Sequence, residues 1–249
     1  MVRLSSTGAA LVAATALAAA SCGSSSTAPA ATTSVTTPTA PATLPSFFQE
    51  FGNGTAVSLA GQTVTLRTSD LPDHNSPYYG AGNAKYEAPQ PGMQLAPNLI
   101  VAQSLTFRVT ASPVSGAASD TPLGPIGVSV NGVALFNQYA AGRVPLGPEI
   151  QSFDRYNGHP SPSGQYHYHV EPLWITAAKG KSALIGVLLD GFPVYGTIDT
   201  NGAAPSDLDA CNGHVGATPH FPQGIYHYHV TSAPPYISGC FRGTPGTIG

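Results

Sequence analysis

The sequence predicts a mostly β fold: a single β-sandwich or barrel-like domain built by tandem duplication, with pseudo-twofold symmetry between its halves. The first reason is composition, since 28 Gly and 24 Pro among 249 residues suit short strands joined by tight turns better than helices. The second reason is the hairpin signal Asn-Gly or Asp-Gly between short apolar runs. The third is a block ending in Tyr-His-Tyr-His that occurs twice.

Charge is scarce in this sequence. Charged residues make up 8% of the chain, against about 25% in an average soluble domain, and the formal net charge is −3. The nine Lys and Arg residues are scattered over the whole length, whereas a nucleic-acid-binding surface needs a basic stripe. The sequence therefore predicts no nucleic-acid partner.

Residues 1–21 have the features of a signal peptide. A positive charge at Arg3 is followed by an apolar run, residues 8–20, that is too short to span a bilayer. The small residues Ala-Ala-Ser directly before Cys22 resemble the lipobox of bacterial lipoproteins, in which the cysteine is acylated. We therefore expect lipidation at Cys22 and a membrane-anchored protein outside the cytoplasm, on the cell envelope. Secretion after an Ala-x-Ala-like cleavage site is the alternative.

The next segment, residues 22–46, predicts a disordered tether. It is rich in Ser, Thr, Ala and Pro, carries no charge and has almost no large apolar side chain, so it has too little surface to bury in a core. The folded domain is expected over residues 47–249. Within this domain, residues 47–100 are expected to add strands to the edge of the duplicated core.

The cysteines give one further expectation. With Cys22 used for the lipid anchor, Cys211 and Cys240 remain as an even pair. An exported protein meets an oxidising environment, where paired cysteines form disulfides. We expect one disulfide between Cys211 and Cys240.

The repeat units cover about residues 127–170 and 186–230. Three blocks recur in the same order: residues 127–132 are matched by 186–191, residues 157–159 by 212–214, and residues 164–170 by 224–230. The first block predicts a hairpin with a two-residue turn. The preference of the hairpin turn for Asp before Gly is enough to explain Asp190, and a catalytic role for its carboxylate is the alternative. Phe136 and Tyr195, at the ends of the hairpins, are expected to pack.

The Tyr-His-Tyr-His strands predict a metal site. Side chains alternate along a strand, so the two His of each motif share one face, about 6.6 Å apart at Cα, and the two Tyr share the other. A further His in an Asn-Gly-His turn precedes each strand and can fold back toward it. Imidazole is a common ligand of Zn(II) and Cu(II), and sulfur ligands are scarce in this chain. The six candidate metal ligands are His159, His167, His169, His214, His227 and His229. One shared site and two separate three-His sites both remain open.

A family resemblance adds to this interpretation. It rests on the two Tyr-His-Tyr-His motifs and on LIGVLLDGFPVYG at residues 184–196, LDACNGH at 208–214 and PPYISGCFRG at 234–243. These segments resemble the YHYH domain family of exported bacterial and some eukaryotic proteins, and RTSDLPDHNSPYY at residues 67–79, with His74, is similar to it too. The resemblance implies export and a β-rich architecture. It implies no reaction, because the family is one of unknown activity.

Three functions follow from these patterns. The first is an exported lipoprotein of unknown activity that binds Zn or Cu through clustered His. The second is a metal-dependent hydrolase or other enzyme acting on an extracytoplasmic substrate, although neither a Gly-x-Ser-x-Gly elbow nor a His-Glu-x-x-His motif is present. Asp154, Glu171 and Asp209 would then orient the metal-binding histidines or act as bases, or else they are ordinary loop carboxylates. The expected partners are the membrane, through the lipid anchor, and a metal or small ligand; no protein partner is indicated.

The third function is a structural or surface-assembly β module. Its histidines form hydrogen bonds in a polar core beside the tyrosine hydroxyls, and no cofactor is needed. A large exposed apolar patch would distinguish it. His220, in a loop that is longer in the second unit, is an accessory of the site or a solvated loop residue.

Overall fold

The computed structural model describes residues 43–249, and regular structure begins with the 3-10 helix η1 (Ser46–Glu50), whose Phe47 and Phe48 are buried. The signal peptide, the lipidation of Cys22 and residues 22–42 of the expected tether lie outside the described residues. Between residues 43 and 249, no helix has the length and apolar character needed to cross a membrane.

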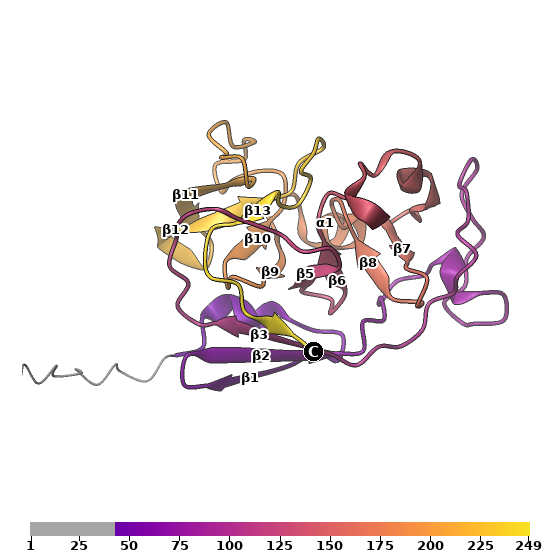
Figure 1. Ribbon diagram of the computed structural model, residues 1–249, viewed down its shortest axis with the longest axis horizontal. Coiled ribbons are helices and arrows are strands. Elements are labelled where there is room, and N and C mark those ends of the chain that lie inside the picture. The colour runs from indigo at the N-terminus through magenta and orange to yellow at the C-terminus, as the bar shows by residue number, and fades with distance from the viewer. Residues whose placement is uncertain (1–42) are drawn as a thin grey trace, which may run out of the picture. The chain divides into compact units, whose positions relative to one another are not determined.

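The larger sheet has eight strands, in the order β11-β12-β10-β9-β5-β6-β8-β7. Four of these strands come from the first unit: β5 (Pro125–Ser129), β6 (Ala134–Phe136), β7 (Gly158–Pro160) and β8 (Tyr166–Tyr168). The other four come from the second unit: β9 (Leu184–Leu188), β10 (Pro193–Tyr195), β11 (Gly213–Thr218) and β12 (Phe221–His229). Two hairpins therefore lie at the centre, and the histidine strands lie at the two ends (Figure 1).

The two units have the same strand pairing. Strands β5 and β9 pair antiparallel at the centre, and from there each unit continues outward through a hairpin partner, a parallel strand and an antiparallel edge strand. The parallel pairs are β6 with β8 and β10 with β12, and the edge pairs are β7 with β8 and β11 with β12. The halves therefore match in pairing as well as in sequence. Their origin by tandem duplication stays a prediction.

A second sheet lies beside the first in Figure 1 and has the order β1-β2-β3-β14. It contains β1 (Ala56–Ala60), β2 (Thr63–Thr68), β3 (Leu105–Thr110) and β14 (Thr247–Ile248), all antiparallel. The expectation that residues 47–100 extend the edge of the duplicated core is therefore wrong. Alternation along β2 buries Val64 and Leu66 and leaves the other face more open, which suits an antiparallel sheet covering a core from one side.

One hydrophobic core joins the two sheets. Val64 and Phe107 of the smaller sheet belong to the same buried cluster as Val128 and Val187 of the larger one. The mostly β fold is thus confirmed. Both sheets are open rather than closed into a barrel, and their packing across one core is sandwich-like.

The remaining elements lie in the connections between strands. They are η2 (Pro77–Tyr79), η3 (Ala141–Arg143), η4 (Gly147–Ser152), α1 (Leu173–Lys179) and a two-stranded pairing of β4 (Ser119–Asp120) with β13 (Cys240–Phe241). The disulfide between Cys211 and Cys240 is confirmed, and it ties the segment before β11 to β13.

Candidate metal centres

The six predicted histidines gather in two separate clusters, one at each end of the larger sheet. The first cluster consists of Glu149, His159, His167 and His169, and the second consists of Asp199, His214, His227 and His229. In each cluster the potential ligand atoms lie within 4.8 Å of one another. Of the two arrangements left open by the sequence, the structure therefore has two three-His clusters. Each also contains a carboxylate, Glu149 or Asp199, that no sequence pattern indicated.

Paired strands position the imidazoles. On β8, alternation places His167 on the face opposite Tyr166 and Tyr168, and His159 lies directly across from it on β7. The second unit repeats this register, with His214 of β11 opposite His227 of β12. Each upstream Asn-Gly-His segment thus returns as the neighbouring strand of its own Tyr-His-Tyr-His motif.

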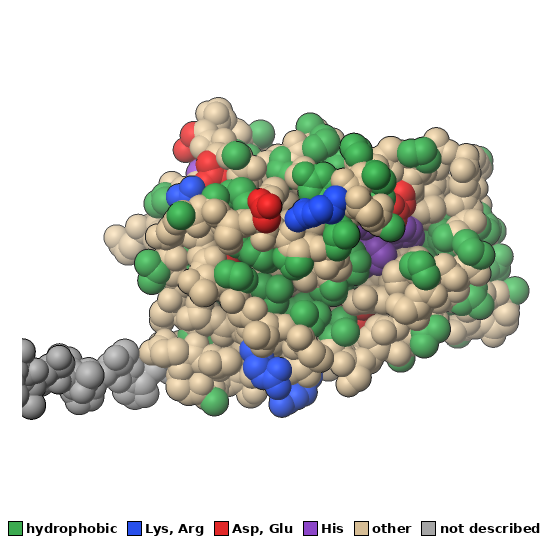
Figure 2. Space-filling model, viewed as in Figure 1, with side chains coloured by type: hydrophobic (Ala, Val, Ile, Leu, Met, Phe, Trp, Pro, Cys, Tyr) green, Lys and Arg blue, Asp and Glu red, His purple; other side chains and the backbone are tan. Residues whose placement is uncertain are grey.

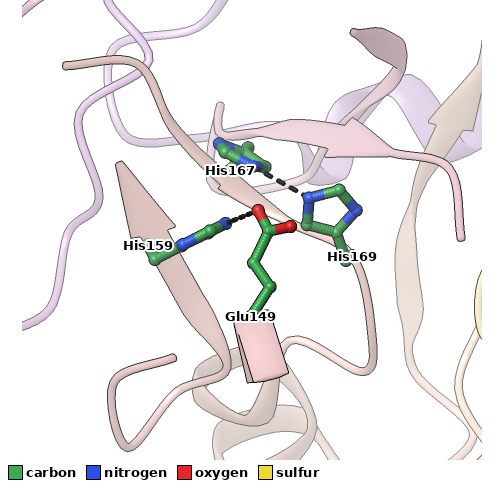
Figure 3. Close-up of side chains that lie close together, drawn as sticks. All are labelled: Glu149, His159, His167 and His169. Atoms are coloured by element: carbon green, nitrogen blue, oxygen red, sulfur yellow. Dashed lines mark hydrogen bonds and ion pairs between the residues drawn. The ribbon is translucent and has the colours of Figure 1, made fainter. Parts of the chain in front are cut away.

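The Nε2 atoms of each cluster point toward one another. His167 Nε2 lies 3.0 Å from His169 Nε2, and Glu149 Oε1 lies 3.2 Å from His159 Nε2 (Figure 3). In the second cluster, His227 Nε2 lies 3.0 Å from Nε2 of both His214 and His229. Asp199 Oδ1 is 3.4 Å from His214 Nε2 and 3.2 Å from His229 Nε2. Four ligands at about 2.1 Å from a tetrahedral metal lie about 3.4 Å apart, close to these separations.

The opposite ring nitrogens, Nδ1, fix the protonation of the imidazoles. In four rings Nδ1 faces a backbone carbonyl, which can only accept, so Nδ1 carries the proton and Nε2 has a free lone pair. The four pairs are His167 with Gln165, His227 with Ile225, His169 with Asn137, and His229 with Gly196.

In the other two imidazoles, a neighbouring side chain keeps the proton on Nδ1. His214 Nδ1 lies 2.8 Å from a carboxylate oxygen of Asp207, which also only accepts. His159 Nδ1 lies 2.8 Å from Ser152 Oγ, and the Ser152 hydroxyl donates to the Glu149 carbonyl at 2.7 Å. Because that hydroxyl proton is already used, His159 Nδ1 must donate. All six rings therefore present an Nε2 lone pair to the inside of their cluster.

Such an arrangement could hold a cation. Two Nε2 lone pairs 3.0 Å apart repel when no proton lies between them, and burial opposes a proton there. Burial lowers the pKa of His169 and of His227 to about 4 and that of His167 well below its usual value. His159 Nε2 is buried, and the Glu149 carboxylate 3.2 Å away offers it no proton. Three imidazoles and one carboxylate form a donor set that fits a divalent transition metal.

The tyrosines of the motif support the histidine strands from behind. Tyr166 Oη donates to Asp154 Oδ2 at 2.7 Å, and Tyr226 Oη lies 3.1 Å from both carboxylate oxygens of Asp209. These two carboxylates also accept backbone N–H groups of the Asn-Gly-His turns. Asp154 and Asp209 therefore lie on the tyrosine side and do not face the histidine clusters. Glu171 pairs with Lys181 at 2.8 Å.

Asp190 at the second hairpin has a structural role. It is fully buried and accepts hydrogen bonds from the Tyr228 hydroxyl and from the backbone N–H groups of Arg242 and Gly243. In this way the carboxylate holds the C-terminal segment against the hairpin. The geometry gives no support to a catalytic role for Asp190.

The two hairpin aromatics pack against the clusters, as expected. The Phe136 ring stacks on His167 with centroids 3.9 Å apart, and the Tyr195 ring meets His227 edge-on at 5.4 Å. Tyr195 Oη also lies 3.0 Å from His220 Nδ1, and His220 Nε2 lies 2.8 Å from Glu50 Oε1. His220 thus joins η1 to the second unit and is not part of the cluster.

The carboxylates of the two clusters do not follow the sequence repeat. Glu149 lies on η4, whereas Asp199 lies in the loop after β10. When the units are aligned through the hairpins, 59 residues apart, Ala140 corresponds to Asp199. When they are aligned through the Asn-Gly-His turns, 55 residues apart, Ala204 corresponds to Glu149. The scarcity of acidic residues, 12 with Asp and Glu together, was the one available hint.

The clusters differ in access. A pocket of about 390 Å³ opens onto the first cluster and is lined by Glu149 and all three of its histidines. At the second cluster the corresponding space is about 10 Å³. In Figure 2, histidine side chains are visible from outside near β8, next to hydrophobic side chains. The first cluster can therefore receive a small molecule in this conformation, and the second cannot.

Comparison with known proteins assigns the chain to a family. A family model described as YHYH protein matches residues 106–206 and 198–243, which include both histidine clusters. No curated protein matches the chain, and no solved structure does.

Proposed function

The chain belongs to the YHYH protein family, and we propose that it is an exported protein that binds two divalent transition-metal ions, one in each histidine cluster. The observation that carries this proposal is the common state of the six imidazoles. Every Nδ1 proton is directed to an acceptor outside the cluster, and every Nε2 lone pair is directed inward. This is the arrangement by which proteins prepare histidines for metal binding.

Zn(II) and Cu(II) suit these donors best. Imidazole and carboxylate are the ligands present, and both cysteines within the described part of the chain are joined in a disulfide. Without thiolate or thioether donors, a site for Cu(I) or an iron–sulfur cluster has no basis. Glu149, His159, His167 and His169 would hold one ion, and Asp199, His214, His227 and His229 the other. A bound ion would supply positive charge and Lewis acidity at each end of the sheet.

The competing structural function accounts for the geometry less well. Histidines that serve only as hydrogen-bonding core residues need a donor or acceptor of the right kind at each nitrogen. The Nδ1 atoms have such partners, but the Nε2 atoms face other Nε2 lone pairs or carboxylate oxygens. Two adjacent lone pairs buried in this way would destabilise a metal-free core.

The location of the protein is part of the proposal. We expect lipidation of Cys22 to hold the domain outside the cytoplasm, where the disulfide is stable. Metal chemistry at the cell envelope then explains a site built without thiolates, since free thiols oxidise there.

Metal content tests the function. The full-length protein is stripped with EDTA, exposed to Zn(II) or Cu(II), dialysed and measured by inductively coupled plasma mass spectrometry. We expect two ions per chain, one in either single variant, His167→Ala or His227→Ala, and none in the double variant. The matched control is His220→Ala, because His220 lies outside both clusters, and it should keep two ions. Retention of no ion by the unmodified protein, or of two by the double variant, would disprove the proposal.

A further inference from the structure

We propose that the ion in the first cluster accepts a further ligand from the pocket, beyond its three histidines and Glu149, and binds a small organic monocarboxylate with an apolar body, whereas the second cluster is closed. This inference rests on the proposed function, because the carboxylate needs the metal. It assigns a different task to each of the two otherwise similar centres.

Space is the first argument. The pocket above the first cluster measures about 390 Å³, within the range of roughly 300–1,000 Å³ that small-molecule sites occupy. At the second cluster, the space of about 10 Å³ leaves at most a single water. Metal sites that act on ligands keep a free position, and structural metal sites do not.

Charge is the second argument. A divalent ion with Glu149 leaves one net positive charge in the first cluster, which a monoanion neutralises. In the second cluster, Asp199 contacts the ligand atoms and the solvent-exposed Asp207 accepts from His214 Nδ1, so a divalent ion there has less uncompensated charge. Among the described residues, no lysine or arginine lines the pocket of the first cluster. An anion entering it can therefore find its counter-charge only at the metal.

The pocket walls are the third argument. Apart from the metal ligands, the lining is mainly apolar, and includes Ala96, Leu123, Phe136, Tyr139, Pro160 and Pro162. Such walls favour a hydrocarbon or aromatic body over a sugar or a polyanion, because they offer few hydrogen bonds to replace those lost with water. The carboxylate of the ligand would displace water from the ion, and its body would fill the pocket.

A single position explains why one cluster is open. The carbonyl groups of Asn137 and Gly196 occupy equivalent places, since each accepts the Nδ1 proton of the last histidine in its cluster. Three residues further along, the second unit has Asp199, whose carboxylate reaches the cluster, and the first unit has Ala140, which lines the pocket. The second unit fills this space with the carboxylate of Asp199, whereas the first unit leaves it free for the carboxylate of a ligand from solution.

Cobalt provides the test. Full-length protein loaded with two Co(II) ions is titrated with benzoate, acetate and benzylamine, and the visible d–d bands of Co(II) are recorded. We expect benzoate to shift the bands of one ion, with an affinity about tenfold or more above that of acetate because its ring is buried in the pocket. Benzylamine has the same shape but the opposite charge, and should leave the bands unchanged.

Variants show which cluster gives the benzoate shift. His227→Ala, which retains only the first site, should keep the benzoate shift, and His167→Ala should lose it. Ala140→Asp should retain both Co(II) ions and weaken benzoate at least about tenfold, while its neutral isostere Ala140→Asn weakens it less. Unchanged bands in protein that holds two Co(II) ions, or a shift that persists in His167→Ala, would overturn the inference and leave the proposed function intact. Failure to bind Co(II) at all would overturn both.

Discussion

The two histidine clusters share an imidazole frame but differ in almost everything around it. In each cluster, two facing strands and the end of a Tyr-His-Tyr-His motif set three Nε2 atoms toward one point. The carboxylate comes from η4 in the first cluster and from the loop after β10 in the second. Sheet pairing thus fixes the imidazoles, whereas the segments between strands decide the carboxylate, the charge and the access of each cluster.

The largest expected difference is the stability that each ion adds. At a free Zn(II) concentration of 1,000 times Kd, one filled site adds about 4 kcal/mol to the free energy of unfolding. We expect EDTA to lower the melting temperature of the unmodified protein strongly, and that of His167→Ala or His227→Ala by about half as much. Differential scanning calorimetry with and without EDTA measures this effect.

Each variant is compared with itself in EDTA, so the cost of the lost imidazole in the metal-free core cancels. The double variant should melt at the same temperature with and without EDTA, and His220→Ala should behave like the unmodified protein. If EDTA leaves the melting temperature of the unmodified protein unchanged, metal stabilises neither cluster, and the two clusters do not differ in the way expected.

A second contrast lies at the centre of the sheet. The two strands that follow the hairpin turns begin at equivalent positions, Ala134 and Pro193. The Ala134 N–H donates to a carboxylate oxygen of Asp70 at 2.7 Å, whereas Pro193 has no N–H to satisfy. The other oxygen of Asp70 is buried and, within residues 43–249, has no hydrogen-bond partner. Burial raises the pKa of Asp70 from 3.8 to about 8.

Asp70 should therefore give the protein an unusual dependence on pH. Between about pH 4 and 8 the folded state keeps a proton that the unfolded state releases, so rising pH favours unfolding by up to about 1.4 kcal/mol per unit. Asp70→Asn removes this contribution. Urea unfolding in EDTA, from pH 5 to 8, should show the stability of the unmodified protein falling relative to the variant. Parallel curves would show that the Asp70 carboxyl does not titrate in this range.

The sequence predicted those features of the clusters that follow from strand geometry. Alternation in Tyr-His-Tyr-His indicated that His167 and His169 share a face, and that the tyrosines lie behind it. The repeat indicated that His159 and His214 have equivalent places. The cysteine count indicated the disulfide, which the structure confirms.

Features that depend on loops and on packing between sheets were not predictable. Glu149 and Asp199 reach their clusters from segments that do not correspond in the repeat, so no alignment of the units reveals them. The expectation for residues 47–100 failed because β2 pairs with β3, which lies beyond that segment, instead of with an edge of the larger sheet. Local pattern shows that a strand forms, but long-range packing selects its partner.

The third contrast concerns the acceptors behind His159 and His214. His214 Nδ1 donates to the carboxylate of Asp207, whereas His159 Nδ1 donates to the neutral hydroxyl of Ser152. A carboxylate behind an imidazole makes the other nitrogen a stronger donor to a metal. The second cluster should therefore bind Zn(II) more tightly than the first. The carboxylate of Asp207 is largely exposed to solvent, which reduces the difference.

Substitution of these acceptors gives the smallest of the expected effects. Loss of such a group typically weakens a metal site by about 10- to 100-fold, and we expect Asp207→Asn to lie near the lower limit. Ser152→Ala should weaken the first cluster less, because it removes a neutral acceptor, and Ser152→Thr should restore the affinity. Chelator competition on the His167→Ala and His227→Ala backgrounds measures each cluster alone. A larger loss for Ser152→Ala than for Asp207→Asn would reverse this ranking, and the carboxylate could then not be the cause of tighter binding in the second cluster.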